Sequence, residues 1–417
     1  MSPPPFTNEY LDGMRRCGDP VADDVVEEFV RVAGVDDPRY LVQRLIAHQR
    51  ELPPADQVPA VRAYFAQHAD LPEWADLATL RRGQQFFNVF GVHIASALFC
   101  ASLPMSYTAP EGAQVLTHTM ALVSDTRRRL AQTGEMLLDV MGANDAASAA
   151  PFGSDTHSFR APHGVRLFHA AVRHMLRHDP TYDAASLGAP INQEDQLGTL
   201  LAFTVVVLDS LERFGISVSD DDRDAYVQLW FTAGTFLGID PEHLVSRRTE
   251  AAAPLQWDEM RELRDLIAHR NAGASESGQL LMRALLAEEA ESVPFFLKGI
   301  PRACTRYLIG DRYSAELKVP RAGWTRVVLR PMPLINKTFF RRVYYDHTGW
   351  LFAKLTRCLY RNWIAQSSEP GPHPWRYEPV VASWKLEPVH VRAGRFARHP
   401  IANGRDRCAP GTAFAAR

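Results

Sequence analysis

The sequence lacks most of the patterns that mark common enzyme classes. It has no glycine-rich phosphate-binding loop and no GxSxG elbow, so it gives no support to a kinase, another nucleotide-dependent enzyme or a hydrolase of that kind. Five cysteines are scattered over 417 residues without a CxxC pair, which excludes a thiolate zinc site or an iron–sulfur site of the usual spacing. This cysteine usage suits reduced thiols.

Alternating β-branched residues, which mark half-buried strands, are also scarce. From Asp23 to about Leu211 the apolar residues instead recur with the period of a helix. The hydrophobic content of 46% is ample for a buried core. We therefore expect a mainly α-helical fold.

An uncharged apolar run from Phe86 to Leu103 approaches the length that spans a membrane. Several polar or small residues interrupt it, namely Asn88, Gly91, His93, Ser96 and Ser102. No second run follows, and no leader-like pattern opens the chain. We expect a buried central helix that stops at Pro104, and a cytoplasmic location.

Start and stop signals predict further helices. Four of them run from about 113 to 122, 125 to 140, 192 to 213 and 339 to 363. Ser219 and Asp222 form a capping box for a helix that runs toward Gly238. The segment from Ala143 to Gly164 is rich in Ala, Gly, Ser and Pro, which predicts a loop.

The net charge of -2 hides an uneven distribution. Residues 318–417 carry 18 Lys and Arg against 5 Asp and Glu, a net +13, and the preceding residues carry -15. We predict a helical domain over 1–317, a basic extension over 318–402 packed on it or associated with it, and a disordered tail over 403–417. The basic charge fits either the acidic body or an anionic lipid surface. Nucleic acid is not expected, because no recognition motif accompanies the charge.

One histidine, His169, lies on an otherwise apolar helical ridge between two arginines. Arg166 precedes it by three residues and Arg173 follows it by four, so on a helix both guanidinium groups lie near its face. Imidazole binds haem iron, and arginines bind haem propionates through charge-assisted hydrogen bonds. The spacing therefore fits a haem site, although a histidine satisfied in the core or exposed at the surface shows the same pattern.

A row of polar residues lies on the helix expected over 125–140. Arg129, Gln132, Thr133 and Met136 follow one another at helical offsets, and we expect them to share one face. If that face meets the core, each polar group needs a partner there. A face turned to solvent is the alternative.

Several separated motifs occur in order between about residues 12 and 312. They are Arg129-Leu-Ala-Gln132-Thr133-Gly134, Arg166-Leu-Phe-His169-Ala-Ala-Val-Arg173, Pro190-Ile-Asn192-Gln193-Glu194-Asp195 with Gly198 and Phe203 after it, and Trp230-Phe-Thr-Ala-Gly234 with Gly238 after it. With these motifs the chain resembles the catalytic domain shared by the latex-clearing rubber oxygenases and the MpaB-type oxygenase of the mycophenolic acid pathway. The resemblance implies a globin-like helical core that holds haem b, with His169 as the proximal iron ligand.

The resemblance also implies roles for the neighbouring residues. It places Arg129, Arg166 and Arg173 near the haem and Thr133 on the distal side. Gln132 stands where the best-known rubber oxygenases have a lysine that can occupy the sixth iron position in a closed form. Because an amide is a poor iron ligand, we expect water, oxygen or an open position there.

The distal glutamate of the family has no secure counterpart, and Glu111 is a candidate. A further arginine near the haem corresponds to Arg302 or Arg306. The relatives insert oxygen across a carbon–carbon double bond of an isoprenoid chain, so we expect a haem-dependent oxygenase that acts with O2 on a lipophilic, isoprenoid-like alkene. A hydroxylase or heteroatom oxidase of a biosynthetic intermediate, and a non-catalytic protein that binds haem or an apolar ligand, are the alternatives. The basic region suggests peripheral membrane contact.

Other polar groupings favour structural roles. The run Asn192–Asp195 begins a helix, because consecutive helical residues point in different directions and cannot surround one metal. His157 and His163 lack the compact spacing of a non-haem iron site. His174 and His178 are four apart, but no Glu follows His174 as in zinc proteases, so a solvated basic face explains them.

Overall fold

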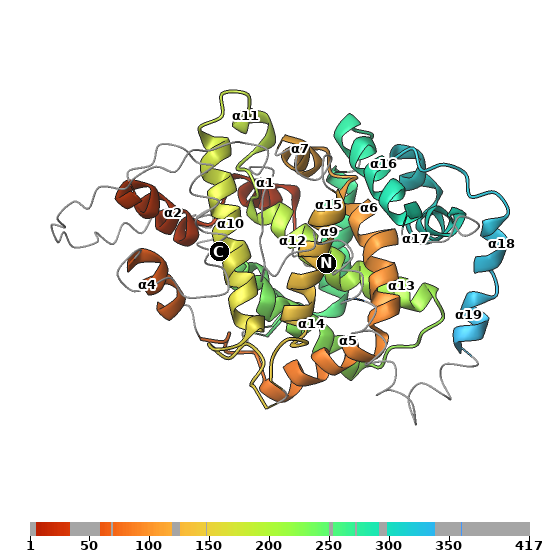
Figure 1. Ribbon diagram of the computed structural model, residues 1–417, viewed down its shortest axis with the longest axis horizontal. Coiled ribbons are helices and arrows are strands. Elements are labelled where there is room, and N and C mark those ends of the chain that lie inside the picture. Colours follow the sequence, from red (N-terminus) through yellow and green to blue (C-terminus); the bar gives the residue numbers. More distant parts are fainter. Residues whose placement is uncertain are drawn as a thin grey trace, which may run out of the picture.

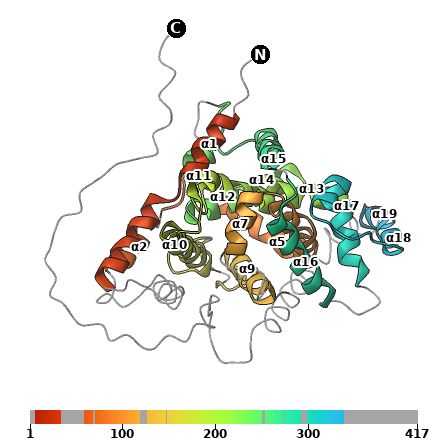
Figure 2. The same cartoon turned by 90° about the horizontal axis from the view of Figure 1, so that it is seen from above.

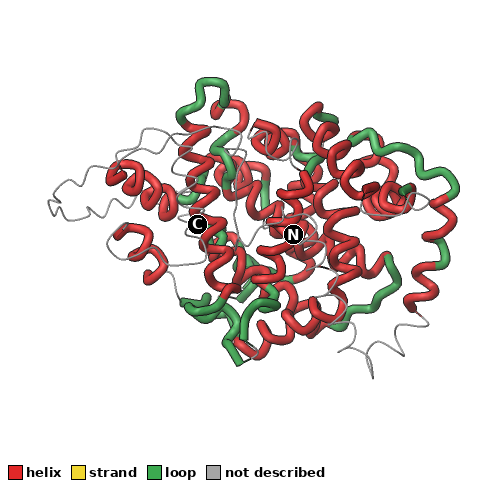
Figure 3. The backbone as a smooth tube through the Cα atoms, in the orientation of Figure 1, coloured by secondary structure: helices red, strands yellow, loops and turns green. Residues whose placement is uncertain are grey.

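The computed structural model describes residues 6–33, 59–67, 70–118, 126–146, 148–249, 253–271, 273–291, 298–337 and 360. Over these ranges the regular structure is helical, and the one pairing of β type is an isolated bridge between Val245 and Pro254. Figure 3 shows helices connected by loops throughout the described chain. The prediction of a mainly α-helical fold is confirmed.

Two long helices pack against each other at the centre of the core. They are α5 (Leu77–Ala97) and α14 (Asp220–Phe236), and both bury apolar side chains along most of their length. Gly83 allows their close approach, because a Cβ there would meet the carbonyl of Ala225. A larger side chain at this position would therefore push the two helices apart.

Side-chain caps begin both of these helices. Asp76 accepts a hydrogen bond from the backbone N–H of Thr79 at 2.8 Å. Ser219 accepts one from the backbone N–H of Asp222 at 3.2 Å, as the capping box predicted. Each cap satisfies a donor that the first helical turn leaves open, so the sequence sets where the two helices start.

The apolar run continues beyond α5 through the π-helical turn η1 (Leu98–Ser102) and into α6 (Leu103–Ser106). The prediction that the helix stops at Pro104 is therefore wrong. A proline ring clashes with the carbonyl four residues before it in a regular helix, and the wider π turn relieves that contact. The whole segment, Leu77–Ser106, is long and apolar enough to cross a membrane, and 56% of its apolar window is buried inside the structure. Its packing against α14 is that of the central core helix that the sequence predicted.

The predicted helix over 192–213 is present as three consecutive pieces. These are α12 (Gln193–Leu201), the π turn η2 (Ala202–Val206) and α13 (Val207–Arg213). Asn192 caps the start by accepting a hydrogen bond from the backbone N–H of Asp195 at 2.9 Å. The helix-initiation interpretation of this motif is confirmed.

The helix α9 (Thr126–Val140) matches its prediction, whereas α10 (His157–Arg177) begins earlier than expected. Thr156 caps α10, so residues 157–164 of the predicted loop are helical. Pro162 lies in the second turn and is buried together with Phe159. Burial of this end of α10 outweighs the low helix propensity of its proline and glycine.

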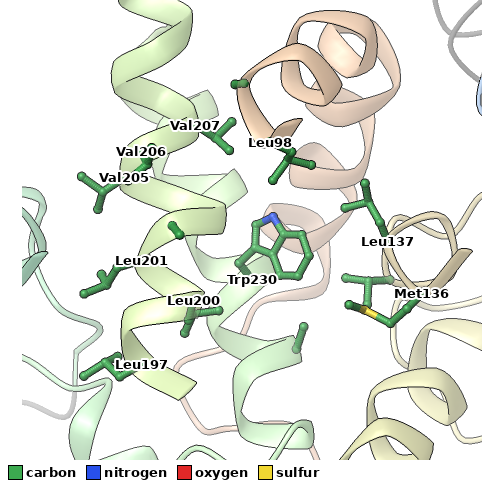
Figure 4. Close-up of a cluster of buried hydrophobic side chains, with 14 of the residues drawn as sticks. Leu98, Met136, Leu137, Leu197, Leu200, Leu201, Val205, Val206, Val207 and Trp230 are labelled. Carbon is green, nitrogen blue, oxygen red and sulfur yellow. The ribbon is translucent and has the colours of Figure 1, made fainter. Parts of the chain in front are cut away.

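An apolar cluster around Trp230 joins these helices (Figure 4). The indole of α14 lies between Leu200 on the α12 side and Met136 and Leu137 from α9, with Leu98 of η1 beside it. All five side chains are buried. The cluster fixes α9 against the core and thereby positions the polar residues on the same helix.

Shorter and peripheral helices surround this core (Figures 1 and 2). They are α1 (Asn8–Arg16), α2 (Pro20–Ala33), α4 (Pro59–Gln67), α7 (Pro110–His118), α11 (Ala184–Leu187), η3 (Pro241–His243), α15 (Trp257–Asn271), α16 (Glu276–Glu291), α17 (Gly299–Glu316), α18 (Thr325–Leu329) and α19 (Met332–Ile335). Helix α2 lies along α10 on one side of the molecule, and α17 to α19 lie at the opposite edge.

Some predictions fall outside the described residues. They include the helix over 339–363 apart from the helical residue Tyr360, most of the basic region and the tail over 403–417. The predicted domain boundaries stay predictions for the same reason.

The cysteines differ from the expectation of five reduced thiols. Cys17 is disulfide-bonded, whereas Cys100 and Cys304 are buried free thiols. The cysteine pattern therefore no longer argues for a reducing compartment.

Candidate active site

The histidine singled out by its flanking arginines lies in the middle of α10. Its Nδ1 atom is buried and has no hydrogen-bond partner in the part of the chain that the structure describes. The residue as a whole nevertheless keeps an intermediate exposure, so the Nδ1 edge is closed while another part of His169 remains accessible. Buried polar atoms in native proteins usually have partners, and one that lacks a partner calls for a functional explanation.

The surroundings of His169 keep its imidazole neutral. Burial, followed by the positive charges of Arg173 and Arg129, lowers its pKa from 6.5 to about 3. A neutral imidazole has a free lone pair, which is the form that binds a metal ion. The ring is therefore held in the ligating state over the physiological pH range.

The facing helix α9 brings two of the predicted polar residues toward α10. The guanidinium of Arg129 lies 5.6 Å from the ring centroid of Phe168, the neighbour of His169. Gln132, on the next turn of α9, is buried with 6% of its surface exposed. The helix pair thus places the cation of Arg129 beside α10, and the amide of Gln132 is buried on the same helix α9.

Thr133 does not join this buried row. Its side chain is exposed, and its hydroxyl donates to the carbonyl of Arg129 at 3.0 Å. Consecutive residues on a helix point about 100° apart, so Gln132 and Thr133 cannot both face the same neighbour. The expectation that Arg129, Gln132, Thr133 and Met136 share one face is therefore wrong for Thr133.

The two arginines that flank His169 are bound by carboxylates from the N-terminal region. Arg166 binds Asp19 with two hydrogen bonds, Nε to Oδ2 at 2.6 Å and Nη2 to Oδ1 at 2.8 Å. Arg173 is fully buried and donates from Nε to Oδ1 of Asp23 at 2.7 Å. In this structure both arginines hold α2 against α10, which differs from the propionate contacts that the spacing suggested.

Contacts from other helices fix this ion-pair network in place. The side chain of Gln193 donates to the carbonyls of Gly18 and Gly238 at 2.8 and 2.9 Å, and its oxygen accepts from the backbone N–H of Asp240 at 2.9 Å. Gly238 has a φ of +100°, and a Cβ there would run into the carboxylate of Asp19. The segment before α2 is thus clamped between α10 and the start of α12.

The two candidate arginines of α17 differ in their contacts. Arg306 donates to the carbonyl of Val319 at 3.1 Å and to Asp311 at 2.6 Å, so its guanidinium is hydrogen-bonded to residues near it in sequence. Arg302 has a buried Nε without a hydrogen-bond partner among the described residues. Arg302 is therefore the one with donor capacity left for a ligand, although no described contact joins it to His169.

Glu111 belongs to a separate group of charged residues at the start of α12. Arg15 and Arg270 both bind Glu194, at 2.9 and 3.1 Å. Burial raises the pKa of Asp195 to about 6, with the charge of Arg15 opposing that shift and those of Glu194 and Glu111 adding to it. Glu111 thus acts on this group, and no described contact brings it to His169.

The remaining histidines do not build a metal centre. Within the described ranges no group of three or more His, Cys, Asp or Glu side chains is arranged to hold a metal ion. His163 is fully buried among aromatic rings, and its Nδ1 lies 2.8 Å from the carbonyl of Phe159. His174 and His178 have ring centroids 4.5 Å apart on the outer part of α10.

The sequence interpretation missed Asp19 and Asp23, the partners of the flanking arginines. They are 147 and 150 residues away from those partners along the chain. The one local signal is their spacing of four, which places both carboxylates on one face of a helix start. That signal becomes specific only when α2 is known to pack against α10.

Comparisons with known proteins bear on this arrangement. Residues 80–342 match the family described as the catalytic domain of the ER-bound oxygenase mpaB/B' and of rubber oxygenase. The rubber oxygenase of Streptomyces sp. (strain K30) is 25% identical over 295 residues, which cover 70% of this chain and 68% of that protein. The structure of latex clearing protein in the closed state matches with a TM-score of 0.64 and 22% identity over 84% of this chain and 91% of that one. The structural likeness demonstrates a shared helical fold.

Proposed function

The chain belongs to the family of the mpaB/B' and rubber oxygenase catalytic domains, and from that premise we propose that it is a haem b-dependent oxygenase. Membership makes the protein an oxygenase. Its proposed reaction is the cleavage or oxygenation of a lipophilic, isoprenoid-like alkene with O2. The haem and the substrate class are the proposed part.

The observation that carries the haem proposal is the state of His169. Its ring is neutral because its pKa is lowered to about 3 by burial and by the charges of Arg173 and Arg129, and its Nδ1 lacks a partner among the described residues. A buried, neutral, incompletely satisfied imidazole fits the axial ligand of a haem iron. His163 offers a contrast on the same helix, because it is fully buried among aromatic rings, whereas part of His169 remains accessible.

The fit to the haem carboxylates is different from what the spacing suggested. Arg166 and Arg173 are held by Asp19 and Asp23, so either arginine would have to give up a buried ion pair to reach a ligand. Asp23 would keep its second partner, Arg177, at 2.6 Å. We propose that both arginines support His169 through the packing of α10, and that Arg129, which acts on His169 from α9, is the cation that faces a bound haem.

The other residues of the site would set the surroundings of the reaction. When bound, haem supplies the iron chemistry that activates O2. Gln132 is buried and its amide can both donate and accept a hydrogen bond, so we propose that it orients a small polar ligand. Phe168, the buried neighbour of His169, would exclude water and favour a lipophilic substrate.

The first test is the ultraviolet–visible spectrum of the purified protein as isolated, after dithionite and after carbon monoxide. We expect a Soret band and a carbonyl complex of the histidine-ligated type, because His169 would provide an imidazole rather than a thiolate. A colourless protein that takes up no added haemin would contradict the proposal.

The second test separates the possible reactions of a haem-loaded protein. Oxygen consumption is followed while isoprenoid alkenes are added, and the products are weighed by mass spectrometry. Cleavage adds two oxygen atoms across two carbonyl fragments, whereas hydroxylation adds one to an intact skeleton. Haem binding without oxygen consumption on any lipophilic substrate would favour a non-catalytic haem protein.

A further inference from the structure

The segment that follows α17 turns its largest apolar side chains outward. Trp324, Val327, Leu334 and Ile335 have 66%, 60%, 66% and 50% of their surface exposed. They include most of the large hydrophobic side chains that are exposed in the described chain, and they fall within a dozen consecutive residues. Scattered exposed apolar residues need no explanation, but a concentration of this kind marks an interaction surface.

The opposite side of this segment is anchored to the body through smaller and polar residues. Thr325 donates to the carbonyl of Gly299 at 3.1 Å, and the amide of Asn336 donates to the carbonyl of Phe214 at 2.6 Å. Leu329 is buried with 6% exposed. These contacts fix the orientation of α18 and α19, so the outward position of Trp324 is part of the fold.

Positive charge surrounds the exposed apolar residues. Lys318, Arg321, Arg330 and Lys337 are all exposed, and residues 318–337 contain no Asp or Glu. On the neighbouring α17, the exposed Asp311 is already paired with Arg306 at 2.6 Å. Figures 1 and 2 show α18 and α19 at one edge of the molecule.

We propose that this basic-apolar face, formed by the exposed side chains of residues 318–337, binds the surface of an anionic lipid bilayer. Trp324 and the three aliphatic side chains enter the interfacial layer, and the four basic side chains contact lipid phosphates. Tryptophan is favoured at this depth because its ring is apolar and its N–H is polar.

Other partners fit the same face less well. A two-fold dimer through it would place the same four positive charges on both sides of the interface. The core of a protein interface is usually depleted of charge, whereas here charge and apolar groups alternate. Nucleic acid would satisfy the charge but leave the aliphatic side chains without a partner. The proposal is independent of the proposed haem chemistry.

The experiment is flotation of the full-length protein with vesicles of phosphatidylcholine alone and of phosphatidylcholine mixed with phosphatidylglycerol. We expect binding to the anionic vesicles that weakens with added salt, because exposed charges are screened. Two variants test the face: Trp324→Ser with Val327→Ser removes apolar contacts, and Arg321→Gln with Arg330→Gln and Lys337→Gln removes charge.

The matched control removes three exposed arginines elsewhere, with Arg16→Gln, Arg81→Gln and Arg283→Gln. It changes the net charge by the same amount as the charge variant. Each basic residue near an anionic surface contributes about fivefold, so the charge variant should bind roughly a hundredfold more weakly than the control. All variants should retain the circular dichroism and melting temperature of the parent, since the replaced side chains are exposed.

Three results would overturn the proposal. The first is absence of binding to anionic vesicles, and the second is equal loss in the charge variant and the control. The third is a concentration-dependent dimer in light scattering that the Trp324→Ser and Val327→Ser variant dissociates, because the face would then join two copies of the chain. Blue-shifted tryptophan emission with anionic vesicles that disappears in Trp324→Phe would support insertion of this residue.

Discussion

Helix α10 carries two polar regions that differ in whether a charged side chain from another part of the chain is paired with them. Arg166 and Arg173 are matched by Asp19 and Asp23 through short hydrogen bonds that join α10 to α2. His169 lies between those arginines in sequence, yet its buried Nδ1 has no partner among the described residues. The same helix therefore contains two ion-paired arginines, of which Arg173 still has an Nη2 atom without a hydrogen-bond partner among the described residues, and the histidine for which we propose a ligand role.

We propose that the two arginines build the fold and that His169 binds a ligand. A buried ion pair is costly to break, because breaking it leaves an uncompensated charge, so it holds two helices in one arrangement. A neutral imidazole with an unsatisfied nitrogen contributes little to folding and is available for coordination. We therefore expect substitution of His169 to change haem binding first, and substitution of the carboxylates that pair with the arginines to change the free energy of unfolding first.

The largest expected effect is the loss of haem from His169→Ala. The variant removes the proposed axial ligand, so bound haem measured by the pyridine haemochrome assay should fall to background while the far-ultraviolet circular dichroism stays helical. His174→Ala, five residues along the same helix, is the control and should keep its haem. Full haem with an unchanged spectrum in His169→Ala would remove this residue from the assigned role.

The next effect concerns the buried ion pair between Asp19 and Arg166. Asp19→Asn keeps the side-chain oxygen that accepts from the backbone N–H of Ala22 but leaves Arg166 buried without a counter-charge. We expect the free energy of unfolding, from urea denaturation, to fall by about 3–5 kcal/mol. The control is Glu28→Ala, which breaks an exposed pair with Arg31 and should cost less than about 1 kcal/mol.

The double variant Asp19→Asn with Arg166→Met tests the role of the arginine. It removes both charges, so part of the lost stability should return. It should also retain haem if Arg166 supports α10 only. Recovered stability with lost haem would show that Arg166 contacts the haem in addition to its role in packing α10.

A smaller, spectroscopic effect is expected at α9. Gln132→Lys places an amine at the buried position, and a haem-loaded variant should acquire a low-spin, nitrogen-ligated spectrum at alkaline pH, where the amine is neutral. Thr133→Lys places the same amine at the exposed neighbour and should leave the spectrum unchanged. The reverse outcome would mean that Thr133, rather than Gln132, faces the haem.

The smallest effect is on the pH dependence of stability of the haem-free protein. The pKa of His169 is about 3 when folded and 6.5 in its ordinary state, so between these values the unfolded chain binds a proton that the folded chain does not. The free energy of unfolding should therefore fall as the pH decreases from 6.5. His169→Gln should make this slope shallower without abolishing it, because burial also lowers the pKa of His93 to about 4. Equal slopes in urea denaturation between pH 7 and pH 5 would contradict the burial of His169.

Local rules explain why most of the helices could be predicted from the sequence. The helix over 125–140, the helix after Ser219 and the helix after Asn192 each follow from apolar periodicity and a capping side chain within a few residues. Pro104 and Pro162 were misinterpreted as a stop and as part of a loop. A π turn and burial in the core accommodate them, and neither can be recognised from neighbouring residues alone.

By itself the sequence determined the helical class, the long apolar core helix and the position of His169 on its ridge, because each depends on spacing along one helix. Only the tertiary structure determined which polar groups find hydrogen-bond or ion-pair partners within the protein. Asp19 and Asp23 meet their arginines across about 150 residues of chain, and Gln132 separates from Thr133 only because α9 has a buried side. Contacts between helices depend on how the helices pack, so a local sequence pattern does not predict which donor will hydrogen-bond to an acceptor on another helix.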